Sequence, residues 1–232
     1  MTPDGESAGL ESIDHLDAIY EMRHTEKLNR DRAVVWDCVV NRVIQPLVPQ
    51  NATFLDLGAG DCLVINRVSA REKIAVDLGS RTLASAKSDV RVLQTSSTDL
   101  SALGAQSIDV VFSSNFFEHL PTKQDLLTTL KEVERVLRPG GLLLVIMPNL
   151  RYVRANYWDY LDHQIPLTDR SLAEATVLSG LHVRKVVPRF LPYTINNSRL
   201  PRGRTLVNLY LSFPLAWRLW GKQLFLIAEK RI

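Results

Sequence analysis

Apolar and polar residues alternate in blocks between residues 53 and 149, and these blocks predict strands and helices in turn. Short, mostly apolar runs typical of buried strands occur at Phe54–Leu57, Val90–Leu93 and Leu142–Met147. Before the last run, Gln124–Leu137 repeats apolar residues at the spacing of an amphipathic helix. Alternating strands and helices pack as a parallel sheet with helical crossovers, so we predict an α/β fold.

A glycine turn follows the first of these runs. Gly58, Ala59 and Gly60 force a tight turn, and glycine lets the backbone approach a ligand without interference from a Cβ atom. Apolar residues at helical spacing run from Leu63 to Val68, which predicts a helix directly after the turn. A strand, a glycine turn and a helix N-terminus together can seat the adenosyl or anionic part of a ligand.

Acidic side chains around this turn indicate which ligand it binds. The dinucleotide motif G-x-G-x-x-G would need a third glycine where this chain has Leu63. The chain instead supplies Asp56 in the strand, Asp61 in the turn and Asp77 at the end of the next predicted strand. An acid at the place of Asp77 can accept hydrogen bonds from both ribose hydroxyls, and Asp56 can face a cation. S-adenosylmethionine (SAM) has an ammonium, a sulfonium and no phosphate, so it fits these groups better than NAD does.

Four motifs in order make the chain resemble the class I SAM-dependent methyltransferases between about Thr53 and Asn149. They are the glycine motif, the ribose acid, the fourth strand and the turn into the fifth strand, found here at Asp56–Gly60, Asp77, Ser107–Phe112 and Arg138–Met147. Cys62 departs from the family pattern, which often has another glycine there. The resemblance implies a Rossmann-like, doubly wound sheet of seven strands in which strand seven is antiparallel.

The resemblance also implies which residues hold SAM and release its product, S-adenosylhomocysteine (SAH). The glycine motif and the ribose acid would contact the adenosyl part, and the chain after the fourth strand would contact the methionine end. The adenine contact is open between the backbone around Ser97 and the side chain of Asp99. The expected cofactor-binding residues are Asp56, Gly58, Ala59, Gly60, Asp77, Leu78, Ser97, Asp99 and Asn115.

Two further regions are expected to shape the acceptor site. In this family an N-terminal helical segment lies over the cofactor, and the apolar spacing predicts such a segment at Ile13–Leu47. Aromatic residues beside charged and amide groups, late in the chain, suit sugars or planar substrates. The expected acceptor contacts are Tyr20, Arg23, Phe117, Tyr157 and Trp158. Ordinary packing is the alternative for the two helical residues and for Phe117.

Transfer of a methyl group to a hydroxyl requires a base within hydrogen-bond reach. We expect His163 in that role, because the ordinary pKa of histidine, about 6.5, suits neutral pH. Asp162 or Asp159 could orient the ring, and we select Asp162. A structural role for His163 is the alternative. His119 lies in a Glu-His-Leu sequence that is common in the family, so we expect its role to be structural.

The chain divides into an N-terminal helical lid, residues 1–50, and a SAM-binding domain, residues 51–232. An insertion at about 191–221 combines prolines and arginines with an apolar stretch. It could pack on its own domain as a lid, touch a membrane surface or form the face of a homodimer. The elements predicted around it are the helix Asp169–Ser179 and the strands Val183–Phe190 and Leu224–Glu229.

Composition narrows the classes of partner. The chain has 28 basic and 25 acidic residues, and this formal net charge of +3 argues against a nucleic-acid partner. Cys38 and Cys62 have no metal-ligand spacing and no disulfide framework, so we expect no metal. We find no signal peptide and no long apolar run in the sequence, and we therefore expect a cytoplasmic protein.

These observations predict a methyltransferase that acts on a small molecule, with the hydroxyl of a sugar or of a glycosylated metabolite as the favoured acceptor. The alternatives are an N- or C-methyltransferase for another metabolite and a partner protein that binds SAM without catalysis. The intact acids and glycines of the turn favour a working donor site, but they do not identify the acceptor.

Overall fold

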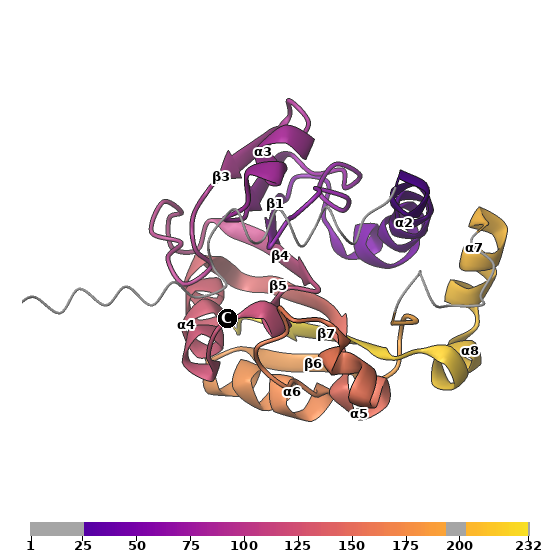
Figure 1. Cartoon of the computed structure of the whole chain (residues 1–232). Coiled ribbons are helices and arrows are strands. Elements are labelled where there is room, and N and C mark those ends of the chain that lie inside the picture. The colour runs from indigo at the N-terminus through magenta and orange to yellow at the C-terminus, as the bar shows by residue number, and fades with distance from the viewer. Residues whose placement is uncertain (1–25, 194–202, 232) are drawn as a thin grey trace, which may run out of the picture.

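The computed structural model describes residues 26–193 and 203–231, and a single seven-stranded sheet lies at its centre (Figure 1). The strands are β1 Thr53–Leu57, β2 Glu72–Val76, β3 Val90–Leu93, β4 Ile108–Ser114, β5 Leu137–Pro148, β6 His182–Val187 and β7 Gln223–Glu229. They lie in the order β3-β2-β1-β4-β5-β7-β6. β7 is antiparallel to both of its neighbours, and the other neighbouring pairs are parallel. This sheet confirms the predicted Rossmann-like α/β fold with an antiparallel strand seven.

The strand order reverses between β1 and β4. From β1 the chain adds β2 and β3 on one side, and from β4 it adds β5 on the other. In open α/β sheets, ligands bind in the crevice outside the carboxyl ends of the strands at such a switch point. The Ser113 hydroxyl donates to the Leu57 carbonyl at 2.9 Å and ties the two strand ends together. The turn after β1 and the loop after β4 therefore emerge side by side.

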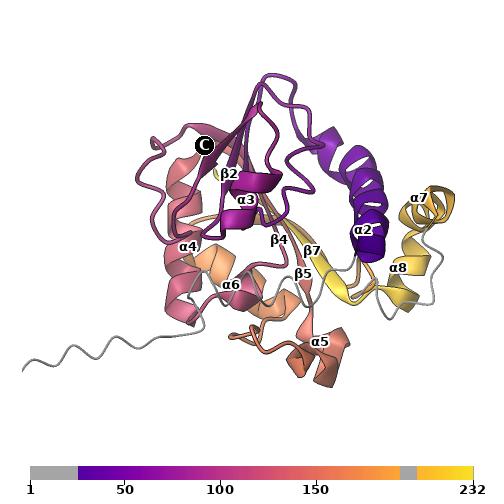
Figure 2. The same cartoon turned by 45° about the horizontal axis from the view of Figure 1, so that its top comes forward.

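Helices cover both faces of the sheet (Figure 2). α4 (Lys123–Val136) and α6 (Asp169–Leu178) pack on one face, where Leu130 of α4 is fully buried. α2 (Glu26–Val39) covers the other face, and its Trp36 belongs to a second buried cluster. All of β1 is buried, as expected for a strand covered on both faces.

The predicted N-terminal helical segment is helical in its described part. α2 continues into a π-helical turn at Val40–Ile44 and a 3-10 turn at Gln45–Leu47. Pro46 lies in this last turn, and its ring is compatible only with the start of a helix, so the segment ends there. The expected acceptor residues Tyr20 and Arg23 lie outside the described residues.

The helix predicted from Leu63 to Val68 is wrong, because the chain makes consecutive turns there. Cys62 has a φ of 55°, in the left-handed region that interrupts a right-handed helix. The Asn66 and Val68 N–H groups do donate to carbonyls four residues earlier, at 3.1 Å each, but the Arg67 N–H donates to the Val64 carbonyl three residues earlier, so no regular helix forms. The Ile65 N–H, which would have no partner within a helix that begins at Leu63, donates to Asp56 Oδ2 at 3.2 Å.

The junction between α4 and β5 also differs from the prediction. α4 ends at Val136, and β5 begins with the next residue and contains the Arg138–Gly141 sequence that predicted a turn. Gly140 has a φ of 77°, and a Cβ atom on Gly141 would lie 2.8 Å from the Arg138 carbonyl oxygen. Glycine at these two positions lets the backbone bend without leaving the sheet.

The later elements follow the prediction closely. The short helix α3 (Ser80–Ser85) follows β2. α6 begins after Thr168, whose hydroxyl accepts from the Ser171 N–H at 3.1 Å, while Ser171 Oγ accepts from the Thr168 N–H at 3.0 Å. This reciprocal cap fixes the start of the helix. β6 ends before Pro188, because proline has no N–H to donate to a neighbouring strand.

The described part of the predicted insertion consists of α7 (Arg204–Ser212) and α8 (Pro214–Trp220), between β6 and β7. α7 lies beside α2 in both views (Figures 1 and 2). Arg42 joins them by donating to Asn208 Oδ1 and to Ser212 Oγ, each at 2.9 Å. The insertion is thus fastened to the segment that follows α2.

The two helices of the insertion also present apolar side chains to solvent. The exposed ones are Leu206, Leu209, Phe213, Leu215, Leu219 and Trp220. Among the arginines of the insertion, Arg204 pairs with Asp37 of α2, and Arg199 and Arg202 lie outside the described residues. Among the described helices, none combines the length and the apolar character that a membrane crossing requires.

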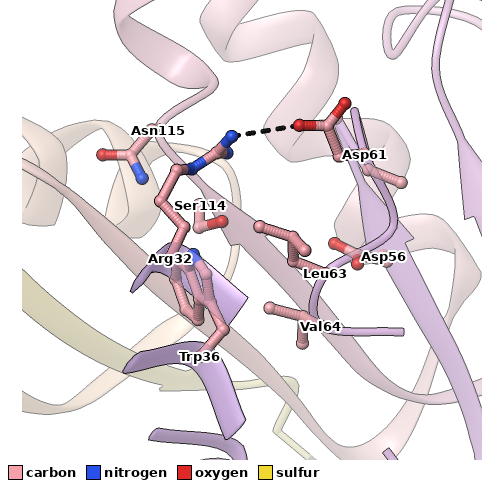
Figure 3. A pocket seen from close by; sticks show the side chains of 10 residues that line it. Arg32, Trp36, Asp56, Asp61, Leu63, Val64, Ser114 and Asn115 are labelled. Carbon is pink, nitrogen blue, oxygen red and sulfur yellow. Dashed lines mark hydrogen bonds and ion pairs between the residues drawn. The ribbon is translucent and has the colours of Figure 1, made fainter. Parts of the chain in front are cut away.

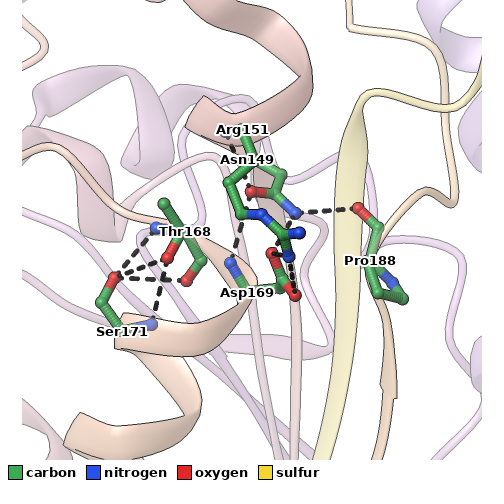
Figure 4. A network of polar contacts seen from close by, with 6 residues as sticks. All are labelled: Asn149, Arg151, Thr168, Asp169, Ser171 and Pro188. Carbon is green, nitrogen blue, oxygen red and sulfur yellow. Dashed lines mark hydrogen bonds and ion pairs between the residues drawn. The ribbon is translucent and has the colours of Figure 1, made fainter.

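A buried polar network joins the end of β5, the start of α6 and the end of β6 (Figure 4). The fully buried Asn149 donates through Nδ2 to Asp169 Oδ1 at 2.8 Å and to the Pro188 carbonyl at 2.9 Å. Its Oδ1 accepts from the backbone N–H groups of Arg151 and Asp169, each at 3.3 Å. Arg151 also donates to both carboxylate oxygens of Asp169 at 2.9 Å. The Asn149 amide thus uses both donor hydrogens and both acceptor sites.

We predict that Asn149→Ala lowers the free energy of unfolding by about 2–3 kcal/mol, because it leaves the Pro188 carbonyl and the buried end of Asp169 short of donors. Urea unfolding followed by circular dichroism measures the loss. Asn156→Ala is the matched control: Asn156 bonds Asp159 at the exposed surface, so its loss should change the stability by less than about 0.5 kcal/mol. Equal losses in the two variants would contradict the importance of the network.

Candidate active site

The turn after β1 depends on its glycines for two reasons. Gly58 and Gly60 have φ values of 72° and 48°, which side chains other than glycine rarely adopt. A Cβ atom on Gly58 would also lie 2.4 Å from the ring of Phe116, which packs on the turn from the loop after β4. On the other side, the N–H groups of Gly58 and Ala59 donate to the Val76 carbonyl at 2.9 and 3.2 Å. The glycine turn is held between the end of β2 and Phe116.

Asp77 lies beside the same turn. Its Oδ2 accepts from the Gly60 N–H and its Oδ1 from the Gly79 N–H, both at 2.8 Å. These two backbone donors hold the carboxylate beside the glycine turn. Leu78 follows it and is 41% exposed. The residues expected to bind the ribose are therefore neighbours in the fold, and their role stays a prediction.

Asp56 is a buried acid at this edge of the sheet. Its side chain lies at the end of β1, where Oδ2 accepts from the Ile65 N–H. Burial raises the pKa of Asp56 to about 7, the backbone hydrogen bond lowers it, and the nearby charge of Asp77 raises it further. A buried carboxylate with so little compensation would be stabilised by a positive charge.

A cavity of about 70 Å³ opens above Asp56 (Figure 3). Side chains from the glycine turn, from the end of β4 and from α2 line it; they include Asp61, Leu63, Val64, Ser114 and Asn115. Arg32 and Trp36 of α2 form the wall opposite the turn, and Arg32 Nη1 pairs with Asp61 Oδ2 at 3.0 Å. Arg81 holds the other oxygen of Asp61 at 3.3 Å. Positive and negative groups thus face one another across the cavity.

The chain after β3 carries the residues expected near the adenine. Ser97 is buried, and its hydroxyl shares a hydrogen bond of 2.8 Å with Thr129 of α4. Asp99 is exposed, and its Oδ1 accepts from the Ser101 N–H at 3.0 Å, which caps the next turn. The hydrogen bonds with Ser101 lower the pKa of Asp99. The choice between the backbone around Ser97 and the side chain of Asp99 stays a prediction.

The loop after β4 is fixed by its first residue. Asn115 has a φ of 47°, its N–H donates to the Ile146 carbonyl at 2.9 Å, and its Oδ1 accepts from Gln223 Nε2 at 2.9 Å. The expected acceptor residue Phe117 is 1% exposed and belongs to the core cluster under the sheet, so the structure directs its ring away from the surface. Phe116, its neighbour, is the ring that lies on the glycine turn.

A second polar cluster forms where the loops after β4 and β5 meet. His119 Nδ1 is 2.9 Å from the Asp162 carbonyl oxygen and 3.4 Å from Asp162 Oδ2. His119 Nε2 is 3.9 Å from Glu118 Oε1, and the rings of His119 and His163 meet edge to face with their centroids 5.0 Å apart. The expected pair His163 and Asp162 is therefore joined by Glu118 and by His119, for which we expected a structural role.

Aromatic rings surround His163. Its ring lies 4.5 Å from that of Tyr157 and stacks on Tyr160 at 5.2 Å. Tyr157 is fully buried, and its hydroxyl donates to the Ile165 carbonyl at 2.6 Å, so it supports the loop from below. Trp158 is 53% exposed and packs on Tyr157. Of Tyr157 and Trp158, which were both expected to contact the acceptor, only Trp158 presents its ring to solvent.

Sequence reasoning missed Arg32 and Trp36 of the cavity wall, and it undervalued Glu118. The first two lie four residues apart in a predicted helix, a spacing that places both on one face, and this signal could have identified them. Glu118 gave a weaker signal, a single acid between two phenylalanines and a histidine. Only the fold shows that it is buried.

Comparisons with known proteins find methyltransferases. A family model described as a methyltransferase domain matches residues 55–145. The trans-aconitate 2-methyltransferase of Azoarcus sp. (strain BH72) is 33% identical over 102 residues, which cover 42% of this chain and 39% of that protein. The chain thus spans well under half the length of the curated relatives that it matches.

Solved structures share the fold. A SAM-dependent methyltransferase from Archaeoglobus fulgidus superposes with a TM-score of 0.65 and 17% identity, over 93% of this chain and 99% of that one. The geranyl diphosphate C-methyltransferase of Streptomyces coelicolor A3(2), solved with Mg²⁺, a substrate analogue and SAH, gives a TM-score of 0.58 and 15% identity over 82% and 74% of the two chains. Residues 55–145 thus match a methyltransferase domain, and the strand order and the glycine turn are those that the resemblance to class I SAM-dependent methyltransferases implies.

Proposed function

We propose that the chain binds SAM at the carboxyl ends of β1 and β4 and transfers its methyl group to a small-molecule acceptor. One observation carries the donor site: Asp56 and Arg32 line the same cavity. The methionine end of SAM bears an ammonium and a carboxylate, and these charges suit Asp56 and Arg32 respectively. A pyrophosphate would instead meet the negative charges of Asp56 and Asp61. The cofactor of the family therefore fits the residues that are present.

We further propose that the acceptor is a hydroxyl of a sugar or of a glycosylated metabolite. The histidine cluster beside the donor site supports this choice, because a hydroxyl must lose its proton during transfer whereas an amine needs less help. The exposed Trp158 ring offers an apolar face of the kind that stacks on sugar rings. His163 is our candidate for the base, and Asp162 for the acid that supports it through the cluster.

The reaction breaks the bond between the methyl carbon and the sulfonium sulfur and forms a bond between that carbon and the acceptor oxygen. The electron pair of the broken bond stays on sulfur, which becomes the neutral thioether of SAH. The hydroxyl proton passes to His163. Because the donor is already activated, the main task of the protein is to hold the oxygen in line with the carbon–sulfur bond.

Two other activities would use the same donor cavity. An N- or C-methyltransferase would transfer the methyl group without depending on His163 for a hydroxyl proton. A non-catalytic SAM-binding partner would bind the donor and transfer nothing. Donor binding, acceptor choice and dependence on His163 therefore separate the three.

We predict that radioactive methyl groups from labelled SAM enter nucleotide sugars or glycosides, and that amines and carboxylic acids such as trans-aconitate, for which one relative is named, accept none. His163→Gln should lower turnover about 100-fold at unchanged SAM affinity. His182→Gln in the exposed part of β6 is the matched control and should keep full turnover. Methylation of an amine that tolerates His163→Gln would contradict the proposal.

Asp77→Ala should weaken SAM binding at least about tenfold, since a hydrogen bond to a charged group contributes about 1.5–3 kcal/mol. Isothermal titration calorimetry measures this. Glu174→Ala, which removes an exposed acid from α6, should leave the affinity unchanged. Thermal unfolding without SAM shows whether the variant keeps its fold, because Asp77 also holds Gly60 and Gly79. Wild-type affinity in a folded Asp77→Ala protein would exclude a ribose contact.

Asp56→Asn should stabilise the SAM-free protein at pH 8 and weaken SAM binding. The carboxyl group has a pKa of about 7 in the folded chain and an ordinary value of 3.8, so the native state holds its proton more tightly than the unfolded state does. Its contribution to stability is therefore complete below about pH 4 and is lost as the pH rises through 7, by an upper bound of about 4 kcal/mol.

Thermal unfolding of wild type and Asp56→Asn at pH 4, 6 and 8 tests this. The advantage of the variant should grow with pH, because only the wild type acquires a buried charge. Calorimetry with SAM at pH 8 should show the opposite order, with the wild type binding more tightly. If the difference in melting temperature does not depend on pH, ionisation of the Asp56 carboxyl group does not cause it.

A further inference from the structure

Glu118 is a buried acid whose surroundings leave it incomplete. Its side chain is fully buried, and in the described part of the chain neither carboxylate oxygen has a hydrogen-bond partner. Among the ion pairs of the described residues, Glu118 pairs with His119, whose Nε2 lies 3.9 Å from Glu118 Oε1. Burying a carboxylate without donors or a paired charge costs free energy, so such groups in proteins are usually paired or bind a metal.

Two imidazoles converge on this carboxylate. One oxygen of Glu118 and one ring nitrogen each of His119 and His163 all lie within 4.8 Å of one another. Ligands at the usual zinc distances of about 2.0–2.2 Å are roughly 3.5 Å apart in a tetrahedron. Small rotations of the side chains would therefore bring the three atoms onto one cation.

Hydrogen bonding selects the form of His119 that can bind a metal. Its Nδ1 lies 2.9 Å from the Asp162 carbonyl oxygen, which can only accept, so Nδ1 carries the proton. In the neutral ring, Nε2 then keeps its lone pair, and Nε2 is the nitrogen directed at Glu118. Histidines that ligate metals generally donate their other N–H to a carbonyl or carboxylate in this way.

The backbone holds the two loops in place. The Glu118 carbonyl accepts from the Gln164 N–H at 2.8 Å and from the Ile165 N–H at 3.3 Å. The buried Tyr157 hydroxyl donates to the Ile165 carbonyl. His163 is therefore fixed beside Glu118 by the fold itself, as a preformed ligand site requires.

We propose that Glu118, His119 and His163 bind a divalent transition-metal cation, and that Zn²⁺ is the ion this donor set favours. Two imidazole nitrogens and one carboxylate oxygen form a common zinc-binding set, whereas Mg²⁺ prefers oxygen ligands alone. The expectation of no metal rested on the spacing of the cysteines, whereas these three ligands come from two loops that are far apart in the sequence. Three protein ligands leave a tetrahedral ion with one open position.

The role of the ion in catalysis rests on the proposed function, whereas its binding does not. An acceptor hydroxyl at the open position would lose its proton more readily, as metal-bound water does. With the ion bound, His163 would serve as a ligand in place of its role as the base, and the hydroxyl proton would pass to solvent water. Because zinc can accept a fifth ligand, an acceptor with two adjacent hydroxyls, as many sugars have, could bind through both.

The test uses the full chain, freed of metal by dialysis against a chelator. Titration with Co²⁺, followed by visible absorption, and with Zn²⁺, followed by calorimetry, should each show one ion per chain. Mg²⁺ should bind at least about 100-fold more weakly than Zn²⁺. Glu118→Gln, which keeps the shape of the side chain, and His163→Gln should each weaken Zn²⁺ binding at least about 100-fold. His182→Gln, outside the cluster, should bind as the wild type does.

SAM binding by the two variants reports that their fold is intact, and His119→Gln replaces either one that fails to fold. Absence of stoichiometric Co²⁺ and Zn²⁺ binding overturns the proposal, and so does wild-type Zn²⁺ affinity in the folded variants. Zn²⁺ binding that depends on Glu118 in a protein that does not bind SAM would support the metal site and contradict the proposed function. Dependence of sugar methylation on Zn²⁺, lost with a chelator and restored by the ion, would support both.

Discussion

The pairing of β1 with β4 is the constraint on which the rest of the molecule depends. In this pairing Leu57 lies opposite Ser113, and the Ser113 hydroxyl bonds the Leu57 carbonyl. The glycine turn and the loop that follows Asn115 therefore leave the sheet together, which lets Phe116 rest on Gly58. A shift of this register would move Asp56, in β1, relative to the chain after β4, which carries Glu118 and His119.

Two buried carboxylates lie at this edge, Asp56 below the donor cavity and Glu118 beside the histidines. Burial raises the pKa of each to about 7, which expresses the cost of charging an acid away from water. A folded domain has only about 5–15 kcal/mol of net stability, so two buried carboxylates lower that stability considerably when they are charged. They are understandable if each has a positively charged partner that arrives from outside the chain.

The sequence predicted the sheet well, because its signals are local: apolar runs mark the strands, and Gly58, Gly60 and Asp77 follow them at fixed places. The prediction failed where contacts between parts of the chain that are distant in sequence determine the structure. The turns after Cys62 depend on the Asp56 carboxylate, and the orientation of Phe117 depends on which ring of a Phe-Phe pair meets the core. The cluster of Glu118 and His163 depends on backbone bonds between two loops, which no spacing within either loop reveals.

The attachment of α7 to the first described helix has a mechanical consequence. The chain that carries Arg32 and Trp36 over the donor cavity continues to Arg42, which grips α7, and Asp37 on the same helix pairs with Arg204. A displacement of the insertion must therefore either break these polar contacts or move α2, which forms one wall of the cavity. Access to the donor cavity is therefore mechanically coupled to whatever binds the exposed apolar surface of α7 and α8.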